Sequence, residues 1–193
     1  MLTSITPLGE RSRGFSWRLT AAAFAAGAVA TGALAGAAAG ALGSLLPDGS
    51  WRAVAALVVL LAALGFDATP LGRRLPTTRR QVNEDWLARY RGWVYGVAFG
   101  AQLGTGLATI VTSAALYAAA LGAVLCGTVT QGLAVGAALG VTRALSLLPA
   151  RGVRDTHGLM ALHERLTALA APSRWLVVVA EAAAVGVVIA ALA

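Results

Sequence analysis

The sequence contains no lysine, a single cysteine and few charged or aromatic residues. Charged residues make up 12% of the 193 positions, whereas an average soluble domain is about 25% charged. A soluble fold of this length needs more polar surface, so the scarcity of charge argues against one. Aromatic residues make up 6%, and the apolar residues are mainly alanine, leucine, valine and glycine. This composition suits closely packed membrane helices.

The single cysteine, Cys126, excludes an intramolecular disulfide, a CxxC redox pair and a thiolate metal cluster. We interpret it as a small apolar residue near a helix end, as free cysteine usually is. A disulfide between two copies is the alternative. No HExxH, Gly-x-Ser-x-Gly or paired-carboxylate motif is present. We therefore expect no enzymatic activity, no cofactor and no metal site.

Long uncharged segments dominate the chain, and a membrane-spanning helix needs about 20 such residues. Residues 92–142 carry no charge, which is too long for one span and suits two spans joined by a turn within 121–128. The turn signal at 47–50 separates the first two spans. We predict an all-α, polytopic membrane helix bundle that forms one integral membrane domain over 1–193. Its five transmembrane helices are expected at 19–46, 51–66, 93–120, 127–148 and 174–193.

The arginines orient these spans, because short cytoplasmic loops carry an excess of basic residues. With five spans, every arginine except Arg52 lies in the N-terminal segment, in 67–91 or in 143–174. We expect these three segments on the cytoplasmic side of a bacterial plasma membrane, with the N-terminus inside and the C-terminus outside. The net charge of +7 is not interpreted as a nucleic-acid-binding surface. The absence of lysine indicates a high-GC genome.

Both cytoplasmic linkers, 67–92 and 149–173, carry an apolar stripe typical of a helix lying in the headgroup region. In the first linker, Thr77, Thr78 and Gln81 form a capping-box signal ahead of the stripe. In the second linker, the stripe precedes Pro172. We predict one interfacial helix in each linker. The first seventeen residues lack a signal-peptide core, so the first span is expected to be retained.

Three predicted spans carry glycine at every fourth position. Small residues at this spacing let helix backbones approach closely, and van der Waals contact then drives association. The pattern predicts a compact centre built from the first, third and fourth spans, although chance in a glycine-rich chain is the alternative. The glycines are Gly32, Gly36 and Gly40, then Gly96, Gly100 and Gly104, then Gly132, Gly136 and Gly140.

The third span also carries a polar stripe, which falls almost opposite its glycine face at 100° per residue. One interpretation is a polar path for a small solute or ion. The other is that the threonine hydroxyls bond back to carbonyls of their own helix, leaving the glutamine to hydrogen-bond a neighbouring helix. The stripe consists of Gln102, Thr105, Thr109 and Thr112, joined by Ser113.

Glu181 is the acidic residue well inside a predicted span, about 10 Å into the bilayer from Arg174. Ionisable groups at such depth usually face a partner or a water-filled cavity. Arg143, near the cytoplasmic end of the fourth span, is expected at similar depth. We predict that Arg143 and Glu181 form an intramembrane ion pair, either a structural clamp or part of an ion-coupled site.

Two segments resemble the membrane thiol-disulfide transporters of cytochrome c biogenesis, the CcdA/DsbD family. Residues 24–27 with 36–43 resemble that family's second helix, and residues 96–105 resemble the glycine-rich start of its fourth. The resemblance implies that this chain corresponds to helices two to six of a six-helix fold. Segments 79–82 and 90–93 are also similar to actinobacterial membrane proteins of uncharacterised function.

The family moves reducing equivalents through two cysteines, one in its first helix and one beside a proline in its fourth. Here the first helix is missing, and residues 103–106, where the second cysteine would fall, contain neither cysteine nor proline. The resemblance therefore implies the fold and not the redox activity.

We predict an integral membrane transporter-like or accessory subunit that handles a small solute or ion along the polar stripe. One alternative is a structural subunit of a larger membrane complex, packed through its glycine faces. Another is a CcdA-like redox protein that has lost its own cysteine pair and uses Cys126 with a partner thiol. The expected partners are the lipid bilayer and either a second copy or another membrane subunit, favoured by the odd helix count.

Overall fold

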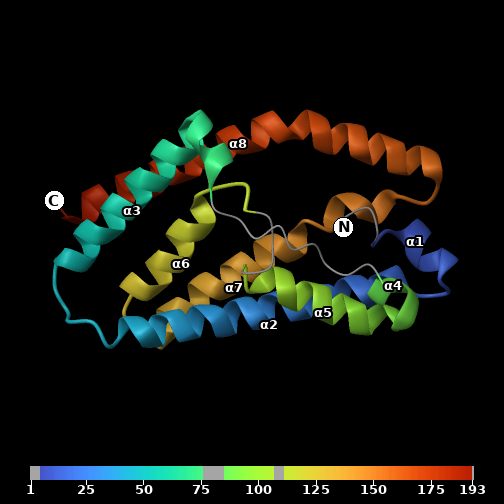
Figure 1. The fold of residues 1–193 in the computed structure, drawn as a ribbon, viewed down its shortest axis with the longest axis horizontal. Helices are drawn as coiled ribbons and strands as arrows, with labels where there is room; N and C mark the ends of the chain where they lie inside the picture. The colour runs from blue at the N-terminus through green and yellow to red at the C-terminus, as the bar shows by residue number, and fades with distance from the viewer. Residues whose placement is uncertain (1–4, 76–84, 107–110, 193) are drawn as a thin grey trace. The chain divides into compact units, whose positions relative to one another are not determined.

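The computed structural model describes residues 5–75, 85–106 and 111–192, and every regular element in these ranges is a helix (Figure 1). The elements are α1 (Pro7–Ser12), α2 (Trp17–Gly43), α3 (Trp51–Ala68), the 3-10 helix η1 (Pro70–Arg74), α4 (Asp85–Arg89), α5 (Gly92–Gly104), α6 (Ala115–Leu125), α7 (Val129–Leu145), the 3-10 helix η2 (Leu148–Gly152) and α8 (Thr156–Leu192).

Four helical stretches in the described ranges are long and apolar enough to cross a membrane. They are Trp17–Gly43, Trp51–Ala68, Val129–Gly152 and Thr156–Leu192. Large apolar side chains on them are exposed, as expected for lipid-facing surfaces, with Leu176 and Val187 of α8 each 70% exposed. The prediction of an all-α, multi-pass membrane protein is confirmed at this level. The count of five spans and the two interfacial helices remain predictions.

The sequence predicts one span at 93–120, whereas the structure has two helices in this region. The first, α5, ends at Gly104, and Gly106 follows with a φ of 70°. A glycine in this left-handed conformation commonly ends a helix, because it has no Cβ to clash with the backbone. The second, α6, begins at Ala115. With 13 and 11 residues, the two helices are about 20 and 17 Å long, shorter than a bilayer core of about 30 Å.

In the C-terminal region, the predicted interfacial helix and the last predicted span, 174–193, fall in one helix. Residues Thr156–Leu192 form one continuous 37-residue helix, α8, with Pro172 inside it. Proline removes one backbone hydrogen bond from a helix, and this helix continues without it. The capping-box residues predicted at 77–81 lie outside the described residues.

The chain divides into two compact units. The first comprises Met1–Gly32, Arg79–Thr109 and Ala137–Leu169, and the second comprises Ala33–Thr78, Ile110–Gly136 and Ala170–Ala193. In the first unit, Phe24, Tyr95 and Phe99 form the centre of the core, and Trp86 of α4 stacks on Phe99 with ring centroids 6.2 Å apart. In the second unit, α3 packs on α6 through a core of small residues, Ala63, Ala114 and Ala118.

The glycines of the fourfold repeats lie where helix backbones touch. In the second unit, a Cβ atom on Gly36 of α2 would come closer than 3.0 Å to the backbone of Gly132 in α7. In the first unit, one on Gly100 of α5 would come equally close to the backbone of Phe24 in α2. Only glycine permits such approach, so α2 makes backbone contact with α5 and with α7. Gly40, Gly96, Gly104 and Gly140 make similar contacts, and Gly32 and Gly136 are buried.

Arg52 of α3 closes the end of α2 in the second unit. Its Nη2 donates hydrogen bonds to the carbonyl oxygens of Gly43 at 3.0 Å and Leu46 at 2.6 Å. Its guanidinium also covers Gly127 in the turn between α6 and α7, where φ is 69°. One arginine therefore satisfies carbonyl groups that the end of a helix leaves without partners.

Candidate functional site

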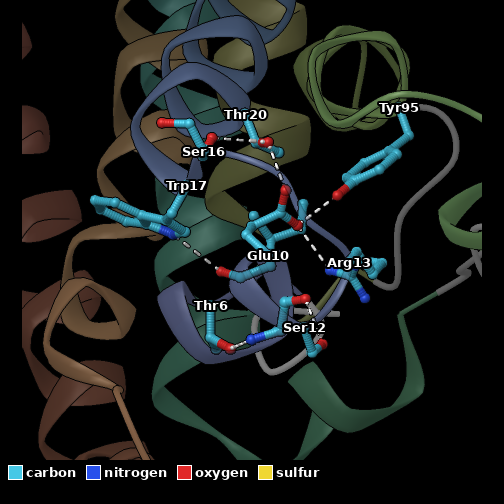
Figure 2. Close-up of polar contacts among 10 residues, drawn as sticks. Thr6, Glu10, Ser12, Arg13, Ser16, Trp17, Thr20 and Tyr95 are labelled. Carbon is cyan, nitrogen blue, oxygen red and sulfur yellow. Dashed lines mark hydrogen bonds and ion pairs between the residues drawn. The ribbon is translucent and has the colours of Figure 1, made fainter.

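The first unit contains a buried carboxylate, Glu10 of α1, at the centre of a polar cluster (Figure 2). It accepts hydrogen bonds from Thr20 Oγ1 at 2.6 Å, from Arg13 Nη2 at 2.7 Å and from the hydroxyl of Tyr95. Glu10, Thr20 and Tyr95 have no measurable exposure to solvent. The three donors come from the end of α1, from α2 and from α5. We name these four residues the Glu10 cluster.

Local sequence places Glu10 at this point. Thr6 caps α1 by accepting a hydrogen bond from the Gly9 amide at 3.1 Å, and Pro7 occupies the first turn, where its missing N–H costs nothing. Glu10 then follows one turn later. Burial lowers the pKa of Arg13, but its interactions with Glu10 and Tyr95 together outweigh that effect, so the pKa lies above its ordinary value.

The Glu10 cluster is a structural clamp. Its carboxylate is held by three donors, two of which come from α2 and α5, so it fastens the N-terminal helix to the unit's core. A buried charge that is paired and fully hydrogen-bonded is stable in place and offers no free oxygen to a ligand.

The second unit holds a different acidic pair around Asp67, near the end of α3. Asp67 is 4% exposed, and its carboxylate accepts hydrogen bonds from the Ala114 amide at 2.9 Å and from the Ser113 hydroxyl. Ser113 in turn accepts from the Ala115 amide at 3.1 Å. These groups lie at the start of α6, where amides lack helical partners and the helix dipole favours negative charge. Asp67 therefore caps α6 from another helix.

Glu181 of α8 is the second carboxylate of this pair. It is 5% exposed, and neither of its oxygens has a hydrogen-bond partner among the described residues of its unit. The charged side chain that acts on it most directly is Asp67, another acid. A carboxyl group buried away from water is costly without a hydrogen-bonding or basic partner. Glu181 is thus a buried acid that has no basic partner among the described residues of its unit and interacts with another acid, Asp67.

A pocket of about 220 Å³ borders Asp67, and its other lining residues include Pro70, Arg174, Trp175 and Val178. Arg174 does not neutralise the carboxylates by a hydrogen bond. Its Nε donates to the backbone oxygen of Asp67 at 2.9 Å, and its Nη2 donates to that of Thr69 at 2.6 Å. Arg174 therefore secures the end of α3 against α8 beside the pocket. We name Asp67, Ser113 and Glu181 the acidic site.

The residues of the predicted polar stripe do not share one helix. Gln102 lies on α5, whereas Thr112 lies before the start of α6, because α5 ends at Gly104. Thr105 donates its hydroxyl to the carbonyl of Gln102 at 3.0 Å, as in the alternative interpretation of threonines that bond to their own helix. Thr109 lies outside the described residues. Gln102 and Thr112 therefore do not belong to one continuous helical stripe.

Arg143 and Glu181 belong to different units, so their predicted ion pair remains a prediction. Arg143 is half-buried in α7. Within the second unit, the neighbour of Glu181 is Asp67 instead.

Sequence reasoning missed Glu10, Tyr95 and Asp67 as site residues. Glu10 resembles a solvated terminal charge, and Asp67 resembles the polar end of an apolar run. The signal for the contact of Asp67 was Ser113, because serine before an apolar run often marks the start of a helix. The signal for Glu10 was weaker, since only its proximity to Arg13 was readable.

Cys126, the possible redox residue, is an exposed C-cap residue of α6. No protein-family model, curated protein or solved structure matches the chain.

Proposed function

We propose that the chain is an integral membrane transporter-like protein that moves protons, with Glu181 as the proton-carrying group and Asp67 as its acidic neighbour. The observation that carries the proposal is the buried Glu181 carboxyl, whose oxygens have no hydrogen-bond partner within the unit. A purely structural acid in such a place is expected to be paired, as Glu10 is. Acids inside membranes commonly belong to proton relays.

The location of the site supports this proposal. Asp67 caps α6, an 11-residue apolar helix that is too short to cross a bilayer alone. Short or interrupted hydrophobic helices mark ion and substrate sites in many transporters, because their ends present unpaired backbone groups at membrane depth. The amides of α6 hold Asp67 in place, and the oxygens of Glu181 remain available to bind and release a proton.

Proton flux into liposomes tests the proposal. Purified protein is reconstituted with a pH-sensitive dye inside, and a potassium diffusion potential drives protons inward. We expect acidification well above that of protein-free liposomes, and at least a tenfold lower rate for Glu181→Gln. Glu164→Gln is the matched control, because Glu164 is an exposed glutamate on the same helix, and it should keep the full rate.

Two outcomes would contradict this function. One is a Glu181→Gln variant that is monodisperse, melts like the unaltered protein and conducts protons equally fast. The other is unaltered protein with no more flux than empty liposomes. Asp67→Asn serves as a second variant, because it retains the shape of the α6 cap and removes the neighbouring charge.

The structural-subunit alternative in its predicted form depends on glycine faces that are free to bind a partner. Gly36, Gly100 and Gly132 instead contact backbones within this chain. A structural subunit would therefore need another surface. The redox alternative rests on Cys126. A Cys126→Ser variant with normal function would contradict it.

A further inference from the structure

The two carboxyl groups of the acidic site differ in how their oxygens are used. Asp67 Oδ2 accepts a hydrogen bond from the Ser113 hydroxyl, and the Ala114 amide donates to Oδ1 at 2.9 Å and to Oδ2 at 3.0 Å. The oxygens of Glu181 accept no hydrogen bond among the described residues of the unit. A proton on Asp67 would therefore compete with donors that are already in place, whereas a proton on Glu181 would not.

A second contact orients the Ser113 hydroxyl. Its oxygen accepts a hydrogen bond from the Ala115 amide at 3.1 Å, and its single hydrogen is directed at Asp67 Oδ2. Ser113 is thus the donor in its contact with Asp67. A hydrogen bond donated to a carboxylate favours the charged form of that carboxylate.

The basic side chain beside Asp67 does not replace this donor. Arg174 uses Nε and Nη2 on the backbone oxygens of Asp67 and Thr69. The helix that Asp67 caps, α6, has no charged residue. The titratable residues of η1, of α6 and of the part of α8 in this unit are Arg73, Arg74, Tyr117, Arg174 and Glu181.

We propose that Ser113 is a positioning residue of the acidic site: it holds Asp67 as the carboxylate, so that the moving proton is carried by Glu181. The inference rests on the proposed function and adds how the site distinguishes two neighbouring acids. Without the Ser113 hydroxyl, the charged form of Asp67 loses a donor. The pair of acids should then keep its shared proton up to a higher pH.

The pH dependence of proton flux into liposomes tests this role. Ser113→Ala should move the pH of half-maximal flux upward by about one unit, as expected for the loss of one hydrogen bond to a charged group. Ser113→Thr keeps the hydroxyl and should restore the original profile. Ser44→Ala is the control and should not shift it, because Ser44 is exposed in the same unit and donates to the Ala41 carbonyl of its own helix.

Infrared titration of the full chain in detergent separates this inference from the proposed function. The band of a protonated carboxyl group should be lost in Glu181→Gln and kept in Asp67→Asn. Ser113→Ala should move the midpoint of this band upward, as it moves the flux profile. If these results hold while liposomes show no flux, the proposed function fails and the role of Ser113 stands.

Two results would overturn the proposal. One is an unshifted titration in a Ser113→Ala variant that melts like the unaltered protein. The other is a carboxyl band that is lost in Asp67→Asn and kept in Glu181→Gln, because the proton would then be on Asp67. If Ser113→Ala does not fold, Ser113→Cys takes its place, since a thiol is a weaker donor. It should shift the midpoint in the same direction, and an unshifted midpoint would contradict the role of the hydroxyl.

Discussion

The carboxylate of Asp67, at the end of α3, accepts a hydrogen bond of 2.9 Å from the backbone amide of Ala114, 47 residues further along the chain. This contact joins two helices at the point where α6 begins. It also fixes one member of the acidic site, because the Ser113 hydroxyl binds the same carboxylate. The start of α6 and the surroundings of Glu181 therefore share one side chain, that of Asp67.

Replacing Asp67 by alanine should destabilise the protein by about 2 kcal/mol, since the start of α6 loses its cap and buried donors lose their acceptor. Asp67→Asn should cost less, because an amide oxygen still accepts from Ala114. Thermal melting in detergent measures both. Asp48→Asn is the control, since the side chain of Asp48 is 98% exposed and loses only a surface ion pair with Arg52, so it should change little. Equal melting temperatures for Asp67→Ala and Asp48→Asn would contradict the capping role.

Gly36→Ala should separate α2 from α7 and lower stability by about 1–3 kcal/mol, the usual cost of overpacking, because the new methyl group meets the backbone of Gly132. The matched control is Gly65→Ala in α3, where a Cβ meets nothing within 4 Å. That variant should be neutral or more stable by up to about 1 kcal/mol, because alanine favours helix. Chemical denaturation compares the two, and a less stable Gly65→Ala would argue against the assigned contacts.

Tyr95→Phe should loosen the N-terminal helix by about 1.5–3 kcal/mol, because Glu10 loses a buried donor to its charge. We expect a lower melting temperature and faster proteolysis ahead of α2. Tyr90→Phe, at a tyrosine that is 49% exposed, should stay within about 0.5 kcal/mol of the unaltered protein. Equal protease resistance in both variants would show that the Glu10 cluster does not hold the N-terminus.

Cys126 should react with a membrane-impermeant maleimide from outside intact cells, because it is exposed in the turn after α6 and that turn is predicted to be external. The cysteine of a Cys126→Ser, His157→Cys variant lies on the predicted cytoplasmic side and should react only after the membrane is permeabilised. The reverse pattern would contradict the predicted orientation.

The long helices could be predicted from the sequence, whereas most of the site residues could not. Uncharged runs bounded by glycine and proline signals placed α2, α3 and α7 closely, and the turn expected within 121–128 lies between Leu125 and Val129. The division of 93–120 into α5 and α6 was not predicted, because hydropathy does not change where a helix ends among apolar residues. Gly106 and Ser113 mark that break through backbone conformation and capping, which act locally.

The acidic site was only half readable. Glu181 stands out as an acid in an apolar run, so its importance could be inferred from sequence. Its neighbour could not, because Asp67 lies on a distant helix and the choice between it and Arg143 depends on tertiary packing. Helix periodicity describes which residues share a face, and it does not state which helix lies against that face.

Arg52 has a consequence for membrane insertion. It is the one arginine predicted on the outer side, and its guanidinium is bound to the carbonyl oxygens of Gly43 and Leu46. Its charge therefore completes the negative end of α2 and is not a free loop charge. Arg52 should consequently be a weak topology determinant. An arginine added to the same loop, without carbonyl oxygens to bind, should oppose the predicted orientation more strongly than Arg52 does.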